Sequence, residues 1–190
     1  MLIKNYLARY VSSVDISIVE QVWVQFRNAL RVVFGFVYVP PSDSQYYSHE
    51  SFSAIREKLH SASQETHHII VGDMNTRFGT TTRDIIPLIE IPNSEIYSYP
   101  NFADKTNNAN DNAEILSAIC IEQSVLVVNN LKTPTSYYPG NKTFRKRNEW
   151  ISEIDVCVAS PSIVHRINEF RVRQDENLPS DHAHVTINVL

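Results

Sequence analysis

The chain has 190 residues, of which 43% are hydrophobic and 20% charged, which is typical of a globular domain with one sizeable core. Its formal net charge of -4 gives no overall attraction to nucleic acid or to an anionic membrane, so binding to a polyanion requires a local basic patch. Two cysteines, Cys120 and Cys157, are too few for a disulfide framework or a structural zinc site, and their apolar surroundings indicate buried thiols in a reducing compartment.

Strands are predicted where apolar residues alternate or run together, and helices where they recur every three to four residues. The segment LRVVFGFVYV at 30–39 is apolar on both faces, as expected of a central strand, and Pro40-Pro41 ends it because proline donates no hydrogen bond to a sheet. Residues 80–106 contain three prolines and are predicted to be mostly loop. In chain order the predicted elements are a strand at 22–26, the strand at 30–39, a helix at 48–61, a strand at 68–71, a helix at 110–123, a strand at 124–129, a hairpin of 136–138 and 142–145 around Pro139-Gly140, and strands at 154–159, 164–173 and 184–190.

This order of elements predicts a single layered α/β (α+β) domain over residues 1–190. The sequence contains no run of 18 apolar residues, and it does not begin with a basic segment followed by an apolar one. We therefore expect no signal peptide, no membrane span and no membrane partner, and an intracellular location, nuclear or cytoplasmic.

Polar side chains able to carry chemistry recur at the ends of these predicted strands. Tyr38 lies one residue from the proline pair, and Asp73 and Asn75 follow the strand at 68–71. Asp155 lies early in its strand, and the Ser-Asp-His at 180–182 directly precedes the last strand. Each feature alone is most simply a core aromatic, a turn, a paired acid or a surface histidine. Four of them at four strand ends are harder to explain as coincidences.

Together these side chains are the parts needed to cleave a phosphodiester. Carboxylates from separate strand ends can hold a hard cation such as Mg²⁺. A histidine held by an acid has a fixed tautomer and can stabilise developing phosphate charge. An amide and a phenol can donate to a phosphate oxygen without adding negative charge, and a second carboxylate can accept a proton from the attacking water.

Several motifs of the chain resemble those of the endonuclease/exonuclease/phosphatase superfamily, most closely those of the endonuclease domain of non-LTR (LINE-type) retrotransposons. They are, in order, VYVPP at 37–41, IIVGDMNTRFG at 69–79, CIEQSVLVVNN at 120–130, PTSYYPGNKTF at 134–144, SEIDV at 152–156 and PSDHAHVTI at 179–187. The resemblance implies a four-layered α/β sandwich of two mixed β-sheets face to face, with helices outside and the site at one end. It also implies Mg²⁺ (or Mn²⁺) as cofactor, DNA as substrate and a reverse transcriptase domain in the parent polyprotein.

The resemblance also implies a role for each catalytic residue at its matching motif position. Tyr38 would touch the scissile phosphate, and Asn75 would help to bind it. Asp73 would orient or deprotonate the attacking water. Asp155 would pair with His182, which would stabilise the transition state.

Further roles fall on Asp181, as a metal ligand, and on the basic segment KTFRKRN at 142–148. This segment is either a solvated hairpin tip or a hairpin whose cations contact nucleic-acid phosphates. The resemblance favours the second interpretation, because retroelement nucleases use a hairpin there to probe the DNA groove. We therefore expect Thr143, Arg145 and Arg147 to be nucleic-acid-binding residues.

The chain departs from the family at its start. The N-terminal part of the family normally brings a strand with an Asn and then a strand with a metal-binding Glu, whereas LIKNYLARYVSS resembles the segment after both. We therefore expect a domain without its first strands, with a sheet edge and apolar faces uncovered, weak binding of Mg²⁺ and poor cleavage. Two alternatives stay open: a phosphatase of lipid or small phosphoesters on the same fold, and an inactive remnant that acts only as a binding module.

Overall fold

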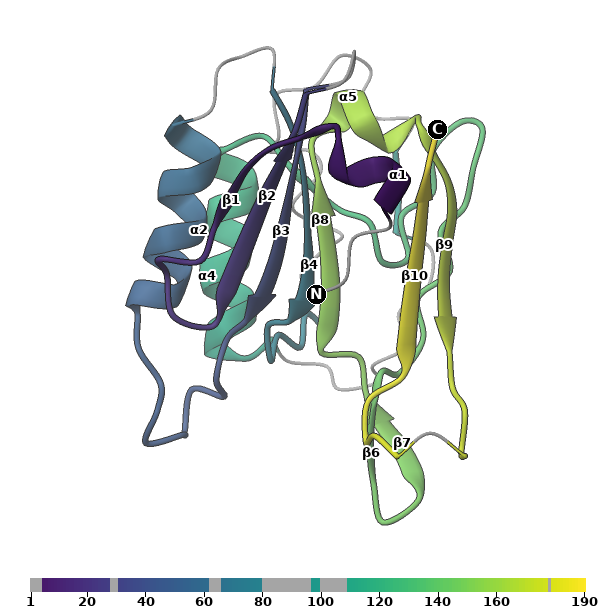
Figure 1. The fold of residues 1–190 in the computed structure, drawn as a ribbon. Helices are drawn as coiled ribbons and strands as arrows, with labels where there is room; N and C mark the ends of the chain where they lie inside the picture. Colours follow the sequence, from purple (N-terminus) through teal and green to yellow (C-terminus); the bar gives the residue numbers. More distant parts are fainter. Residues whose placement is uncertain (1–4, 28–30, 62–65, 80–96, 100–108, 178) are drawn as a thin grey trace.

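The computed structural model describes residues 5–27, 31–61, 66–79, 97–99, 109–177 and 179–190, which form an α/β structure (Figure 1). Its elements are α1 (Asn5–Ala8), β1 (Val11–Asp15), β2 (Gln21–Phe26), β3 (Val32–Tyr38), α2 (Glu50–Ser61), β4 (His67–Asp73), α4 (Asp111–Glu122), β5 (Leu126–Val127), β6 (Phe144–Lys146), β7 (Glu149–Ser152), β8 (Asp155–Ala159), α5 (Pro161–Val164), β9 (Ile167–Arg173) and β10 (His184–Val189). The α/β class expected from the order of the elements is confirmed.

A mixed six-stranded sheet, in the order β1-β2-β3-β4-β8-β5, dominates the structure. The strands β3 and β4 run parallel, with α2 between them in the chain, and the other neighbouring pairs are antiparallel. Because β3 and β4 are parallel, they end at the same edge of the sheet, and the antiparallel β8 begins at that edge. This edge carries the candidate site.

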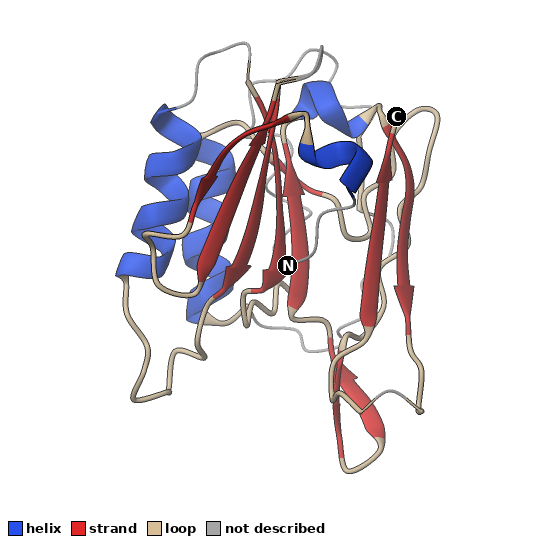
Figure 2. Ribbon diagram, in the orientation of Figure 1, coloured by secondary structure: helices blue, strands red, loops and turns tan. Residues whose placement is uncertain are grey.

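The helices α2 and α4 cover one face of this sheet (Figure 2). In α2, Phe52, Ile55 and Leu59 lie on one buried stripe, as the helical spacing predicted. The helix α4 begins after Asn110, whose side chain accepts a hydrogen bond from the Ala113 backbone N–H and so caps the helix. The periodicity and the cap signal together placed both helices within two residues of their observed bounds.

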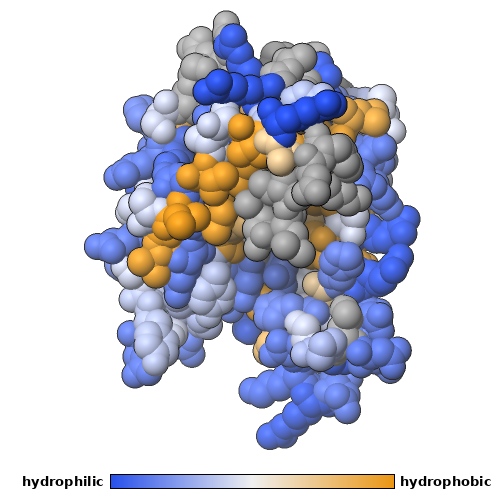
Figure 3. All heavy atoms as spheres, in the orientation of Figure 1, coloured by the Kyte–Doolittle hydropathy of each residue, from blue (hydrophilic) through white to orange (hydrophobic). Residues whose placement is uncertain are grey.

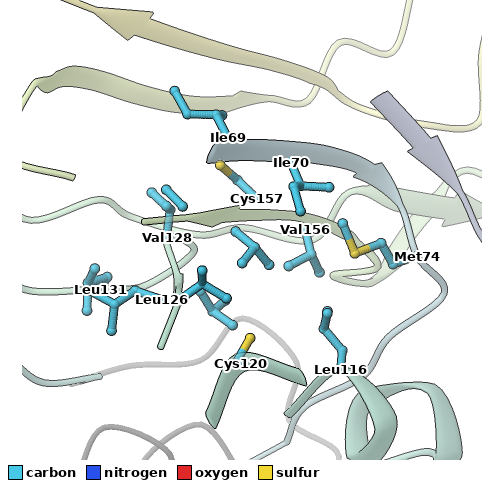
Figure 4. Close-up of a cluster of buried hydrophobic side chains, with 14 of the residues drawn as sticks. Ile69, Ile70, Met74, Leu116, Cys120, Leu126, Val128, Leu131, Val156 and Cys157 are labelled. Atoms are coloured by element: carbon cyan, nitrogen blue, oxygen red, sulfur yellow. The ribbon is translucent and has the colours of Figure 1, made fainter. Parts of the chain in front are cut away.

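Part of the hydrophobic core lies where α4 packs on the sheet (Figure 4). Leu116 and Cys120 of α4 meet the strand residues Ile70 and Val156 there, all nearly inaccessible to solvent. Both cysteines are buried free thiols, and burial raises the pKa of Cys120 to about 12. They pack as small hydrophobic residues, as expected.

A second, two-stranded sheet of β9 and β10 lies on the side of β8 away from α2 and α4 (Figure 1). Ile167 and Phe170 of β9 are buried, and Val185 and Ile187 of β10 pack against the core. Within the described residues this sheet is antiparallel and has two strands, so it is smaller than the mixed second sheet that the resemblance implied.

Apolar side chains gather on the open face of β1, β2 and β3 (Figure 3). Val14 is 50% exposed and Phe36 is 38% exposed, and Val14 pairs with Val24 while Phe36 pairs with Val22. Paired residues point to the same side of a sheet, so these four side chains share one face. Val14 and Phe36 thus leave apolar surface exposed on this face.

The hairpin differs from the prediction. Its strands are β6 and β7, and its turn lies at Arg147 and Asn148, whose φ values are 51° and 65°. Two left-handed turn residues match the right-handed twist of paired strands, which favours this turn although the sequence there has no glycine. Gly140, the turn residue expected, instead packs against Glu153 and Asn130.

Three other boundaries shift for local reasons. The predicted strand at 164–173 begins at Ile167, because Pro161 starts the short helix α5. The predicted strand at 124–129 reduces to Leu126–Val127, and β1 was not predicted because VSSVD is largely polar. Most of the loop predicted at 80–106 lies outside the described residues.

No helix in the described ranges combines the length and the apolar character that crossing a membrane requires.

Candidate active site

Three of the expected catalytic residues lie side by side across three neighbouring strands. Tyr38 at the end of β3 pairs with Asp73 at the end of β4, and Asp73 pairs with Asp155 at the start of β8. Tyr38 and Asp155 are 117 residues apart in the chain. The register of the strands nevertheless places the three side chains on one face of the sheet, at the edge where β3 and β4 end. The buried strands thus deliver a tyrosine and two carboxylates to the same place.

His182 lies between the two carboxylates. Its Nδ1 is 2.9 Å from Oδ2 of Asp155, and its Nε2 is 3.7 Å from Oδ2 of Asp73. The backbone is held by a bridge between His182 and Phe144, and the two rings lie 5.3 Å apart. Because the Asp155 carboxylate accepts the Nδ1–H bond, the ring has a fixed orientation and presents Nε2 toward Asp73.

The surroundings of Asp73 and His182 raise the pKa of both side chains. Burial raises the pKa of Asp73 to about 6, and the negative charges of Asp155 and Asp181 add to this shift. Burial alone would lower the pKa of His182, but its hydrogen bond to Asp155 and the three surrounding carboxylates outweigh burial, so this pKa is raised. The site therefore holds its protons to a higher pH than isolated side chains would, and the Asp73 carboxylate is a stronger base than an ordinary aspartate.

Tyr38 stays protonated in this setting. Its side chain is 41% exposed, and burial of the rest together with the charges of Asp73 and Glu20 raises its pKa. A neutral phenol beside the carboxylates is a hydrogen-bond donor for an anionic ligand.

Asn75 follows in a tight turn after β4. Its φ is 48°, its backbone N–H donates to Oδ1 of Asp73 at 3.0 Å, and its side-chain Nδ2 donates to the Val39 carbonyl at 2.9 Å. Gly72 allows β4 to pass close to β3 just before this turn, because a Cβ there would lie 1.8 Å from the Val37 carbonyl oxygen. The Gly-Asp-x-Asn motif thus places the amide at the rim, with one Nδ2 hydrogen committed to Val39.

Thr143 holds the backbone below the site. Its side chain has no exposed surface, and its Oγ1 accepts hydrogen bonds from the N–H groups of Ile154 and Asp155 at 3.0 and 2.9 Å. Because it is fully buried, the Thr143 side chain cannot contact nucleic acid in this structure. It positions the start of β8 instead.

Asp181 is exposed next to His182, and its backbone carbonyl accepts from the Arg145 N–H. Its expected role was to bind a metal ion, which requires further oxygen ligands around it. In the described parts of the chain, no group of three or more His, Cys, Asp or Glu side chains is arranged to hold a metal ion. The donor set of the described residues therefore does not by itself make up a complete Mg²⁺ or Mn²⁺ centre, and we assign no chemical step to such an ion.

The basic hairpin of β6 and β7 projects beyond the end of the sheet at which β8 and β10 begin (Figure 1). The Arg145 guanidinium stacks over the Trp150 ring at 5.7 Å, and Nη1 donates to the Glu176 carbonyl. Arg147 lies at the exposed tip. Both arginines are thus on the same end of the molecule as His182, and their contact with nucleic acid stays a prediction.

A set of buried polar residues behind Asp155 was not predicted from the sequence. Glu153, Asn129 and Asn130 are nearly inaccessible and hydrogen-bonded to one another. The sequence offered two signals. Glu153 is an acid just before Ile154-Asp155, and Asn129-Asn130 end an apolar run. Neither signal indicated that the two segments meet.

Neither the protein-family models nor the curated proteins contain a match to this chain. Solved structures do match. A 3'-5' exonuclease (NExo) from Neisseria meningitidis is 14% identical with a TM-score of 0.61, over 94% of this chain and 71% of that chain. The endonuclease domain of TRAS1, a telomere-specific non-LTR retrotransposon, is 17% identical with a TM-score of 0.58, over 90% of this chain and 61% of that chain.

An AP endonuclease from Archaeoglobus fulgidus is similar to the same extent, at 14% identity and a TM-score of 0.56, over 94% of this chain and 71% of that chain. At these identities the likeness shows the fold. The chain has the endonuclease/exonuclease/phosphatase fold, as its motifs indicated, and it spans 61% to 71% of the length of these neighbours.

Proposed function

We propose that this chain is a DNA endonuclease of retroelement origin, which nicks DNA by hydrolysing a phosphodiester with Mg²⁺ or Mn²⁺ as cofactor. The observation that carries the proposal is the position of His182 between Asp155 and Asp73, at the edge that Tyr38 also reaches. A fold shared with proteins described as an exonuclease, an AP endonuclease and a retrotransposon endonuclease supports it.

In this proposal Asp73 is the general base. Its raised pKa suits it to take a proton from the attacking water, whose oxygen then bonds to phosphorus as the ester P–O bond breaks. The His182 imidazolium, held by Asp155, faces the negative charge that develops on the phosphoryl oxygens.

Tyr38 and Asn75 would hold the phosphate before reaction. The phenol of Tyr38 is neutral and partly exposed, and one Nδ2 hydrogen of Asn75 is already directed to Val39, leaving the other for a ligand. Neither group adds negative charge to a site that already contains carboxylates.

DNA is favoured as the substrate by the hairpin. Arg145 and Arg147 lie on the same end of the molecule as the site, where a duplex that places its phosphate against His182 would pass. A small phosphoester would not need this basic extension. Because the donor set for a cation is small in the described residues, we expect slow cleavage by this chain.

Single-turnover nicking of supercoiled plasmid tests the proposal. Excess protein is incubated with Mg²⁺ or Mn²⁺, and His182→Ala and Asp73→Asn are compared with His60→Ala, which changes an exposed histidine of α2. We expect slow nicking that only the two site variants abolish and that chelation of the cation stops.

A substrate panel separates the alternatives. Release of phosphate from a small phosphoester or a lipid phosphate, without nicking, would replace the endonuclease by a phosphatase. DNA binding with no hydrolysis of any substrate would indicate a binding module.

A further inference from the structure

Glu153 is a buried carboxylate two residues before the start of β8. Glu153 is 8% exposed, and both of its carboxylate oxygens accept hydrogen bonds from asparagine amides. Nδ2 of Asn129 donates to Oε1 at 2.9 Å, and Nδ2 of Asn130 donates to Oε2 at 3.1 Å. Burying a carboxylate is costly even when it is hydrogen-bonded, so a residue of this type at this place calls for a reason.

Asn129 connects Glu153 to the active-site strand. The Nδ2 that donates to Glu153 also donates to the Asp155 carbonyl at 3.0 Å, and Oδ1 accepts from the Cys157 N–H at 2.8 Å. The amide therefore holds β8 at two successive positions on one side. Glu153 adds a third contact that favours the same orientation of this amide, because only its NH₂ group can face a carboxylate.

Asn130 closes the other side of the carboxylate. Its Oδ1 accepts from the Gly140 N–H at 3.0 Å while its Nδ2 faces Glu153. A Cβ on Gly140 would lie 2.2 Å from Oε1 of Glu153 and 2.3 Å from Nδ2 of Asn130. The backbone of residue 140 thus packs directly on the Glu153 carboxylate and leaves it little freedom.

The backbone of Asp155 is consequently held from two directions. Thr143 accepts its N–H, and Asn129 donates to its carbonyl. Its side chain, between these two fixed points, receives the His182 Nδ1–H bond. A shift of Asp155 would move the imidazole with it.

We propose that Glu153 is a positioning residue for the Asp155–His182 pair and that it acts through the amide of Asn129. The role rests on the proposed function of that pair, and its physical basis is the chain of hydrogen bonds from Glu153 through Asn129 to the Asp155 backbone.

The substitution Glu153→Gln tests the proposal with almost no change in volume. It replaces one acceptor oxygen by an NH₂ group, which must then face an asparagine NH₂ group. Adding Asn130→Asp reverses the direction of that bond, so that the glutamine donates to the new carboxylate, and it restores the net charge. Glu149→Gln, at an exposed position on β7, removes the same charge and is the matched control.

The primary measurement is the NMR signal of the His182 Nδ1 proton in the protein without substrate. We expect Glu153→Gln to increase the exchange of this proton with water by about 10-fold or more, as the hydrogen bond loosens. Glu149→Gln should leave it unchanged, and Glu153→Gln/Asn130→Asp should restore the wild-type signal. In single-turnover nicking, Glu153→Gln should lower the rate about 10- to 100-fold at saturating protein, with DNA affinity unchanged.

A folded Glu153→Gln variant with a wild-type His182 proton signal would overturn the proposal. So would failure of the double variant to restore the signal, which is the deciding comparison if Glu153→Gln alone does not fold. Because the proton signal is read without substrate, a wild-type protein that cleaves nothing contradicts the proposed function and leaves this measurement intact.

Discussion

A hydrogen bond of 2.9 Å joins Nδ1 of His182 to Oδ2 of Asp155, across 27 residues of sequence. It forms because the start of β8 and the residues just before β10 lie at the same end of the structure. A second carboxylate, Asp73, lies 3.7 Å from the other ring nitrogen. A carboxylate thus faces each ring nitrogen of the imidazole, and the pKa values of His182 and Asp73 depend on this arrangement.

Replacing Asp155 by asparagine should lower the pKa of His182. Burial pushes this pKa down, and the hydrogen bond and charge of Asp155 are the first causes that push it up, so their removal leaves burial opposed only by Asp73 and Asp181. The pKa is measured by NMR titration of the imidazole carbon-bound protons. Asp43→Asn, which removes an exposed carboxylate, is the control, and an unchanged His182 pKa in Asp155→Asn would contradict the assigned cause.

Replacing Asp73 by asparagine should stabilise the fold in a pH-dependent way. The pKa of Asp73 is about 6 in the folded chain, against 3.8 in an unfolded chain, so ionising it costs folding free energy. The cost begins as the pH rises above 3.8 and is complete above about 6. The free energy of unfolding in urea should therefore rise by roughly 1–3 kcal/mol at about pH 8 and change little at about pH 3.

The same variant should lose nicking, so stability and activity would change in opposite directions. A decrease in stability at the higher pH would show that the negative charge of Asp73 is favourable in the folded state.

Reversing the charges of Arg145 and Arg147 together should weaken DNA binding and flatten its salt dependence. Each lost phosphate contact removes about 0.9 from the slope of log affinity against log salt concentration, so the slope should fall by roughly 1–2. Fluorescence anisotropy with a duplex at several salt concentrations measures it. Arg166→Glu, an exposed position beside α5, should leave the slope nearer the wild-type value, and an equal loss in both would assign the effect to net charge.

Replacing Gly72 by alanine should destabilise the chain severely. A Cβ at this position would lie 1.8 Å from the Val37 carbonyl oxygen, and the φ of 155° is unfavourable for any other residue. We expect a loss of roughly 3 kcal/mol or more in urea unfolding, or a failure to fold. Val71→Ala, which only shortens a partly buried neighbour, should cost about 1 kcal/mol, and equal effects would contradict the close approach of β3 and β4.

Much of the layout was predictable because it depends on local patterns. The periodicity of Phe52, Ile55 and Leu59 predicted α2, and the apolar runs predicted β3, β4 and β8 close to their observed bounds. The hairpin was misplaced because proline and glycine usually mark turns, whereas here Gly140 is needed for the close contact with Glu153. That requirement arises between distant segments and leaves no local signal.

The sequence by itself determined which polar side chains stand at the ends of the buried strands. Tyr38, Asp73, Asp155 and His182 each stand at the end of an apolar segment, and strand ends are where a buried sheet presents polar groups. Only the tertiary structure decided how they are arranged. The register of three strands aligns the first three, the approach of β10 places His182 between the two carboxylates, and the Glu153 network holds Asp155 in place. The physical reason is that pKa shifts and hydrogen-bond directions depend on distances and burial, which a chain acquires only when segments far apart in sequence pack together.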